Sequence, residues 1–221
     1  MKLLLSAITK FVFGIILVGA LVFLPAGTFN FMGGWLFMML LFIPILIVGI
    51  FLFIKSPKLL EKRLDGKEKE STQKGVVALS GLMFLSGFTV AGLDFRFGWS
   101  SVPRMVTIIA SVLFLVSYAI YAEVMRENAY LSRKIEVQEG QTVVSTGLYG
   151  IVRHPMYAAT VLMFCTFPFI LGSFAACPLF FTYPFIIAIR IKDEEKLLNK
   201  ELAGYTDYKQ RVKYRLIPFV W

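Results

Sequence analysis

Histidine and cysteine are scarce in this chain of 221 residues, which has one histidine, His154, and two cysteines, Cys165 and Cys177. Metal-dependent membrane hydroxylases and desaturases hold their metal with several histidine ligands, so a single imidazole excludes that chemistry. The cysteines lie in apolar segments without metal-ligand spacing, and we predict that they are small buried hydrophobic residues. The sequence therefore predicts no metal site.

Acidic residues are also few, because 14 Asp and Glu stand against 23 Lys and Arg, which gives a formal charge of +9. In a soluble protein this balance would suggest a nucleic-acid partner. Here 57% of the residues are hydrophobic, 22 are phenylalanine and the mean hydropathy is +0.73, well beyond a soluble domain. We therefore expect a membrane protein whose positive charge meets anionic lipid, with no nucleic-acid partner.

Long apolar runs are plentiful, and a helix needs about 20 residues to cross a bilayer. The candidate spans are residues 3–24, 31–54, 75–93, 102–123, 156–171 and 174–190. The first resembles a signal peptide, but Lys10 interrupts it and a second apolar run follows closely, so we expect a retained helix. The last two are short and form a predicted hairpin around Gly172 and Ser173. The predicted fold is all-α and polytopic, with about six membrane helices.

The basic residues are distributed unevenly between the predicted connections. Of the 23 Lys and Arg, only Arg96 and Arg104 fall on the side opposite the termini. The positive-inside rule therefore predicts that both termini and any site beside them are cytoplasmic. Residues 55–75 mix bases with acids and are predicted to form a solvated loop at the lipid surface. Residues 92–104, which include Asp94, are predicted to be an interfacial anchor turn on the far side.

The chain changes character near Glu123, which divides it into two predicted parts. Residues 1–123 hold four apolar spans and few other features, whereas residues 124–221 carry many polar residues at the helix ends. Polar groups beside membrane helices are costly and are functional candidates by default. We therefore expect a cytoplasmic ligand pocket in residues 124–221.

Two polar clusters precede the predicted hairpin. The segment "VQEGQTVVSTGLYG", residues 137–150, is a turn-rich loop with many hydrogen-bonding groups. It leads to "RHPMY", in which Pro155 suits the first turn of a helix, so that His154 lies near the N-cap and Tyr157 in the first turn. A helix N-terminus favours an anionic or polar ligand. The alternative is that these side chains only anchor the helix at the interface.

Two more clusters follow the predicted hairpin. In "AIRIKDEEKLL", Arg190 and Glu194 are four residues apart and share a helix face, while Glu195 lies about 100° round the helix. On spacing alone, an exposed ion pair of little energetic value explains them better than a site does. The basic, aromatic tail, residues 202–221, is predicted to lie on the membrane surface, where it could cover a site.

Taken in order, these clusters resemble the isoprenylcysteine carboxyl methyltransferase family, within a wider group of integral-membrane methyltransferases that includes the phospholipid N-methyltransferases. The matching pattern is "TGLYGIVRHPMY", an apolar hairpin, "R-x-x-x-E-E-x-x-L", "G-Y-x-x-Y-x-x-R-V" and "IPF", within residues 137–221. The combination is specific, although related membrane reductases also carry a string like "RHPxY".

The resemblance implies an S-adenosylmethionine site that opens to the cytoplasm and a lipophilic acceptor that arrives through the bilayer, which could be a small molecule, a lipid or a prenylated protein. Carried onto this sequence, the cofactor contacts would be Gln138, Gln141, Thr142, Val143, Val144, Tyr149, His154, Pro155, Met156, Tyr157 and Glu194. Arg190 would bind the acceptor, and Arg190 and Glu194 would be the catalytic pair. Gln141 stands where the family has a histidine.

The acceptor group decides the expected chemistry. A carboxylate acceptor is already ionised, so positioning dominates and the guanidinium of Arg190 would hold it. An amine acceptor would need a base, for which Glu194 and Glu195 are the candidates. Two other classes stay open: an NADPH-dependent membrane reductase of related architecture, and a non-catalytic transporter or scaffold. The residues do not specify the oligomeric state.

Overall fold

A computed structural model describes residues 2–64, 71–128, 130–131 and 137–221, and these residues form helices and connecting segments without any strand. Residues 65–70 of the predicted surface loop lie outside the described residues. The helices are α1 Lys2–Ala26, α2 Met32–Lys55, α3 Pro57–Leu64, α4 Ser71–Phe97, α5 Arg104–Glu127, the 3-10 helix η1 Gly147–Gly150, α6 Pro155–Ile170, α7 Cys177–Phe180, α8 Tyr183–Glu201 and α9 Tyr205–Arg211. The predicted all-α architecture is confirmed for these residues.

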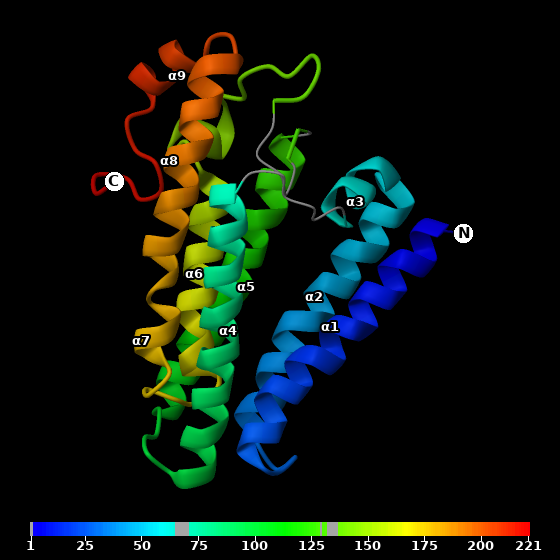
Figure 1. Ribbon diagram of the computed structural model, residues 1–221, viewed down its shortest axis with the longest axis vertical. Helices are drawn as coiled ribbons and strands as arrows, with labels where there is room; N and C mark the ends of the chain where they lie inside the picture. Colours follow the sequence, from blue (N-terminus) through cyan, green and yellow to red (C-terminus); the bar gives the residue numbers. More distant parts are fainter. Residues whose placement is uncertain (1, 65–70, 129, 132–136) are drawn as a thin grey trace.

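Four helices are long and apolar enough to cross a membrane: α1, α2, α4 from Gln73, and α5. They correspond to the first four predicted spans. In Figure 1, α4, α5, α6 and α8 lie side by side, while α1 and α2 form a tilted pair that approaches them at the end opposite α9. Small residues permit this approach, because a Cβ at Gly92 of α4 would lie 2.9 Å from the Val22 carbonyl oxygen of α1.

Phenylalanine rings join the helices in the centre of the bundle. Phe167 of α6 is 2% exposed. Its ring centroid lies 4.7 Å from that of Phe37, 5.7 Å from Phe114 and 5.5 Å from Phe180. Packing of this kind, rather than release of water, holds helices together in a lipid environment. Since α6 is held among α2, α5 and α7, the residues at its N-terminus have a defined position.

The second half of the predicted hairpin differs from the expected single segment 174–190. The structure instead has the short helix α7, two turn residues, and α8, which extends to Glu201. Pro178 and Pro184 each lie in the first turn of a helix. A proline cannot donate to the preceding turn, so each one favours a new helix start and explains the interruption. Because α8 extends to Glu201, Arg190 and Glu194 lie in the interior of this helix.

The turn at the far end of the bundle has a buried acid. Trp99 is exposed, as expected of an interfacial residue, but Asp94 is only 1% exposed. The carboxylate of Asp94 accepts hydrogen bonds from the Ser100 backbone N–H at 2.7 Å, the Ser100 hydroxyl at 2.6 Å and the Ser173 hydroxyl at 2.5 Å. These bonds offset the cost of burying a carboxylate. Asp94 therefore links the α4–α5 and α6–α7 connections, which the prediction of a simple anchor turn missed.

Candidate functional site

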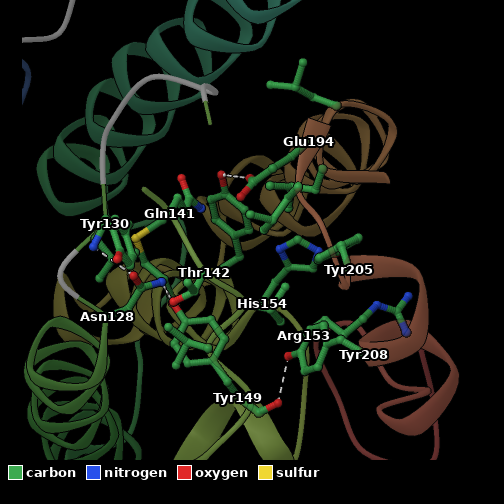
Figure 2. A pocket seen from close by; sticks show the side chains of 18 residues that line it. Asn128, Tyr130, Gln141, Thr142, Tyr149, Arg153, His154, Glu194, Tyr205 and Tyr208 are labelled. Atoms are coloured by element: carbon green, nitrogen blue, oxygen red, sulfur yellow. Dashed lines mark hydrogen bonds between the residues drawn. The ribbon is translucent and has the colours of Figure 1, made fainter. Parts of the chain in front are cut away.

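A polar pocket lies at the end of the bundle where α6, α8, α9, η1 and the loop before η1 meet (Figure 2). Its volume is about 100 Å³. Of the residues assigned to the cofactor by resemblance, those that line it are Gln141, Thr142, Val143, Val144, Tyr149, His154, Met156, Tyr157 and Glu194. Gln138, Pro155 and Arg190 are not among the lining residues. The pocket thus brings together sequence motifs that lie before and after the α6–α8 pair.

The start of α6 has the predicted geometry. Pro155 occupies the first helical turn and His154 is the N-cap residue, with its carbonyl oxygen accepting from the Ala158 N–H at 3.1 Å. His154 is 5% exposed and Tyr157 6%, and both line the pocket. Residues that only anchor a helix at the membrane interface would be exposed, so the burial of both side chains argues against that alternative.

The hydroxyl of Tyr157 connects the two predicted catalytic residues. It donates a hydrogen bond to Glu194 Oε2 at 2.6 Å and accepts one from Arg190 Nε at 2.9 Å. Arg190 and Glu194 therefore share a face of α8, as their spacing predicts, and both are bound to α6. The spacing alone favoured an exposed ion pair between Arg190 and Glu194. The structure instead has both side chains bound to the hydroxyl of Tyr157.

Gln73, in the first turns of α4, is a neighbour of Arg190 that sequence reasoning missed. Its Oε1 accepts from Arg190 Nη1 at 3.1 Å, and its Nε2 donates to Asp193 Oδ2 at 3.4 Å. Gln73 is fully buried. Because 117 residues separate Gln73 from Arg190, no local pattern could indicate the contact. Arg190 consequently lies behind the pocket wall, between α6 and α4.

A buried ionic cluster around Glu195 includes Arg153 and His154, which both line the pocket. Glu195 Oε1 accepts from Arg153 Nε at 2.7 Å and lies 3.3 Å from His154 Nε2, while Oε2 accepts from Arg215 Nε at 2.9 Å. Burial alone would raise the pKa of Glu195, but the hydrogen bonds from His154, Arg153 and Arg215 outweigh it and lower the pKa to about 2. A carboxylate so strongly stabilised is a poor base, so only Glu194 keeps the base role considered for an amine acceptor.

The C-terminal tail packs against the start of α6. Arg153 N–H donates to the Tyr214 carbonyl and His154 N–H to the Arg215 carbonyl, both at 2.9 Å. Arg153 Nη1 also donates to the Val212 carbonyl at 2.7 Å. The tail is therefore an integral part of the site rather than a loose surface cover. The basic and aromatic residues of the tail suggested that it lies near a site. Its backbone hydrogen bonds to residues 153 and 154 could not be predicted from the sequence.

The loop on the opposite wall is shaped by hydrogen bonds from residues around it. Gln138 Nε2 donates to the Tyr130 carbonyl at 2.5 Å, and Gln138 N–H donates to Gln141 Oε1 at 2.9 Å. Asn128 Nδ2 donates to the Tyr149 hydroxyl at 2.9 Å. In Figure 2, Asn128, Tyr130 and Tyr149 face the side of the pocket that carries Glu194 and His154. Gln138 thus positions Gln141 from outside the lining.

Glycine is required where this wall turns into η1. Gly147 has φ +53°, and the carboxylate of Glu127 occupies the position that a Cβ at Gly147 would need. The same carboxylate accepts from the Leu148 N–H at 3.0 Å. The end of α5 and the start of η1 are therefore in direct contact, which positions Tyr149 in the pocket wall.

The side chains of the pocket fit S-adenosylmethionine chemically. A carboxylate, an imidazole, amides and phenols offer both acceptors and donors to an amino-acid group, ribose hydroxyls and an adenine edge. Within the part of the chain that the structure describes, the buried hydroxyl of Tyr205 has no hydrogen-bond partner, which makes it a further candidate ligand contact. The pocket volume of about 100 Å³ is below the roughly 300 Å³ or more that is typical of ligand pockets.

Two known proteins are similar to parts of this chain. Delta(14)-sterol reductase TM7SF2 of Mus musculus is 29% identical over 90 residues, which are 39% of this chain and 22% of that protein. The protein YpbQ of Bacillus subtilis (strain 168) is 29% identical over 93 residues, which are 42% of this chain and 55% of YpbQ. The chain therefore spans about a fifth of one relative and about half of the other.

A family match covers the elements that build the site. Residues 106–200 match the family described as "Isoprenylcysteine carboxyl methyltransferase (ICMT) family". This segment contains the pocket residues His154, Tyr157 and Glu194 as well as Arg190. Together with four helices that could span a membrane, it indicates a multi-pass membrane protein. The match over residues 106–200, less than half of the chain, supports membership of the isoprenylcysteine carboxyl methyltransferase family, a family of methyltransferases.

Proposed function

We propose that this protein transfers the methyl group of S-adenosylmethionine to the carboxylate of a lipophilic acceptor. The observation that carries the proposal is the Tyr157 hydroxyl, which joins Glu194 on the pocket wall to Arg190 behind it. One connected group of side chains thus includes a candidate cofactor contact and a candidate acceptor contact. All three residues lie in the segment that matches the methyltransferase family.

The cofactor, when bound, supplies an electrophilic methyl group on a positively charged sulfur. Glu194, His154 and Tyr149 hold it through hydrogen bonds, with the loop residues Gln141 and Thr142 on the opposite wall. A carboxylate acceptor needs no proton removed, so the protein contributes orientation and charge. In this proposal Arg190 exchanges its hydrogen bond to Gln73 for one to the acceptor carboxylate.

An apolar cleft supports a lipophilic acceptor. It lies between α2 and α5, has a volume of about 280 Å³ and is lined by residues that include Val48, Leu52, Tyr121 and Met125. Met125 also packs against the buried cluster of Val124, Leu131 and Tyr149, which extends to the polar pocket. We propose that an apolar chain enters here from the bilayer, with the active site on the cytoplasmic side.

Purified protein in lipid nanodiscs, supplied with methyl-tritiated S-adenosylmethionine, tests the proposal. We expect label in S-farnesylcysteine with a free carboxylate and none in the matching carboxamide. Alkaline release of the label as methanol identifies an ester. Arg190→Lys reduces the rate, whereas Arg104→Lys, at an exposed position at the far end of the bundle, leaves it unchanged. Alkali-stable label in phosphatidylethanolamine would instead show an amine acceptor, with Glu194 as the base.

The similarity to a protein named as a sterol reductase supports a second candidate, an NADPH-dependent reductase. The two candidates differ in the nucleotide that binds. Tight NADPH binding together with absence of S-adenosylhomocysteine binding by the intact protein would favour the reductase and contradict the methyltransferase.

A further inference from the structure

Tyr205 is the first residue of α9 and has a buried side-chain hydroxyl. The side chain is 4% exposed and lines the polar pocket. Within the described residues its hydroxyl has no hydrogen-bond partner. Neighbouring Tyr208 differs, because its hydroxyl donates to the Tyr149 carbonyl oxygen at 2.7 Å and so ties α9 to η1. One tyrosine of α9 therefore holds α9 to η1, while the other lines the pocket and has a buried hydroxyl without a partner among the described residues.

The surroundings of Tyr205 are those of a subsite for a group that carries both charges. Tyr205 lines the same pocket as Glu194 and His154, and Figure 2 shows it next to His154. Glu194 is an acceptor with a negative charge, whereas the N-terminus of α6 beside His154 has the positive end of a helix dipole. An ammonium group at Glu194 with a carboxylate at the α6 N-terminus satisfies both at once. An α-amino acid has these two groups on one carbon.

The protonation of Tyr205 agrees with a donor role. Burial first, and then the charges of Glu195 and Glu194, hold the pKa of the Tyr205 hydroxyl well above its ordinary value. The phenol therefore keeps its proton at any physiological pH. A buried donor of this kind requires an acceptor atom, and a ligand carboxylate oxygen is a strong one.

We propose that Tyr205 is a cofactor-binding residue whose hydroxyl donates a hydrogen bond to the carboxylate of the amino-acid end of S-adenosylmethionine, beside an ammonium group held by Glu194. The inference rests on the proposed function and adds to it the orientation of the cofactor. The amino-acid end lies between α6, α8 and α9, and the adenosine lies toward the loop wall of Gln141 and Thr142.

Calorimetric binding of two ligands tests this inference: S-adenosylhomocysteine, and 5′-methylthioadenosine, which lacks the amino-acid group. We expect Tyr205→Phe to weaken S-adenosylhomocysteine about tenfold, as for one lost hydrogen bond to a charged group, and to leave 5′-methylthioadenosine unchanged. Tyr214→Phe, in the same tail but outside the pocket lining, is the matched control and is expected to bind both ligands as the wild type does. Because the Tyr205 hydroxyl is unpaired without ligand, the melting temperature of Tyr205→Phe is expected to equal or exceed that of the wild type.

The outcomes separate this inference from the proposed function. If the wild type binds neither ligand, the proposed function fails and the inference falls with it. If the wild type binds both and Tyr205→Phe binds S-adenosylhomocysteine equally well, only the role of Tyr205 is overturned. If Tyr205→Phe weakens both ligands to the same extent, the hydroxyl does not contact the amino-acid end, and the orientation is wrong.

Discussion

Arg153 and Glu195 form an ion pair with an N···O distance of 2.7 Å, and their side chains are only 4% and 5% exposed. They are 42 residues apart in sequence, at the start of α6 and in the last half of α8. The pair therefore fixes these two helices relative to each other at the pocket, whose lining includes Arg153. The adjacent Glu194 points to the other side, where Tyr157 binds it. The two consecutive acids on α8 thus have different roles: Glu195 joins α8 to the start of α6, and Glu194 lines the pocket.

Replacing Glu195 tests whether its ion pair stabilises the fold. Glu195→Gln leaves Arg153 buried without its counter-charge, so we expect a loss of about 3–5 kcal/mol in unfolding free energy. Glu123→Gln is the matched control, because Glu123 pairs with Arg126 on the surface, and its loss is expected to stay below about 1 kcal/mol. Thermal unfolding in detergent gives both values. Equal effects of the two substitutions would show that the buried cluster does not support the fold.

The same cluster predicts how stability depends on pH. The pKa of Glu195 is about 2 in the folded protein against an ordinary 4.5, so its ionised form stabilises the fold above about pH 4.5. This contribution is lost as the pH falls from 4.5 toward 2. The difference in melting temperature between wild type and Glu195→Gln should therefore be constant from pH 8 to pH 6 and shrink below pH 4.5. A difference that vanishes by pH 6 would contradict the assignment.

Arg190 and Glu194 should affect different kinetic constants. Glu194 lines the pocket and Arg190 does not, so Glu194→Gln is expected to weaken S-adenosylhomocysteine binding roughly tenfold or more. Arg190→Lys keeps the charge but loses the planar fork, and we expect kcat to fall about 10- to 100-fold with cofactor affinity retained. Binding calorimetry and initial rates measure the two effects separately. Equal losses of affinity in both variants would place Arg190 at the cofactor instead.

Tyr157→Phe tests whether the hydroxyl of Tyr157 positions both Glu194 and Arg190. It removes the donor to Glu194 and the acceptor for Arg190, so cofactor affinity and kcat are both expected to fall. The fall should be less than the product of the effects of Glu194→Gln and Arg190→Lys, because contacts within one network are not additive. A double-mutant cycle with Glu194→Gln measures this coupling. Fully additive effects would argue against a shared network.

A substitution at Gly147 tests whether the turn into η1 requires glycine. Gly147→Ala must place a methyl group where the Glu127 carboxylate lies and must keep φ at +53°, so we expect a loss of about 2–3 kcal/mol together with weaker cofactor binding. Gly140→Ala, at φ +70° but with open space around it, is expected to cost only about 1–2 kcal/mol, the penalty for the backbone conformation. Thermal unfolding and calorimetry distinguish them. A cost at Gly147 no larger than that at Gly140 would remove the argument for a steric requirement.

Local patterns predicted the features that depend on neighbours in sequence. Apolar runs indicated the four long helices, Pro155 indicated the start of α6, and the spacing of Arg190 and Glu194 indicated a shared face. Each depends on helix geometry alone. Pro178 and Pro184 could also have predicted the interruption between α7 and α8, but the apolar run was interpreted as one continuous segment.

Contacts between distant segments had no such signal. Gln73 meets Arg190 only because α4 packs beside α8, and Glu195 meets Arg153 and Arg215 only once the tail has folded back over α6. Nor could the sequence separate Tyr205 from Tyr208, since both are buried and their partners lie on other elements. The resemblance thus anticipated many of the residues that line the pocket, whereas the contacts that support them depend on tertiary packing.

We propose above all that the pocket between α6, α8 and the loop before η1 binds S-adenosylmethionine. Equilibrium binding of S-adenosylhomocysteine to the purified intact protein, with NADPH measured in parallel, tests it most directly. We predict saturable one-site binding of S-adenosylhomocysteine, weakened by Glu194→Gln and unaffected by Arg104→Lys, with no saturable binding of NADPH. Absence of S-adenosylhomocysteine binding, or affinity that Glu194→Gln leaves unchanged, would contradict the claim.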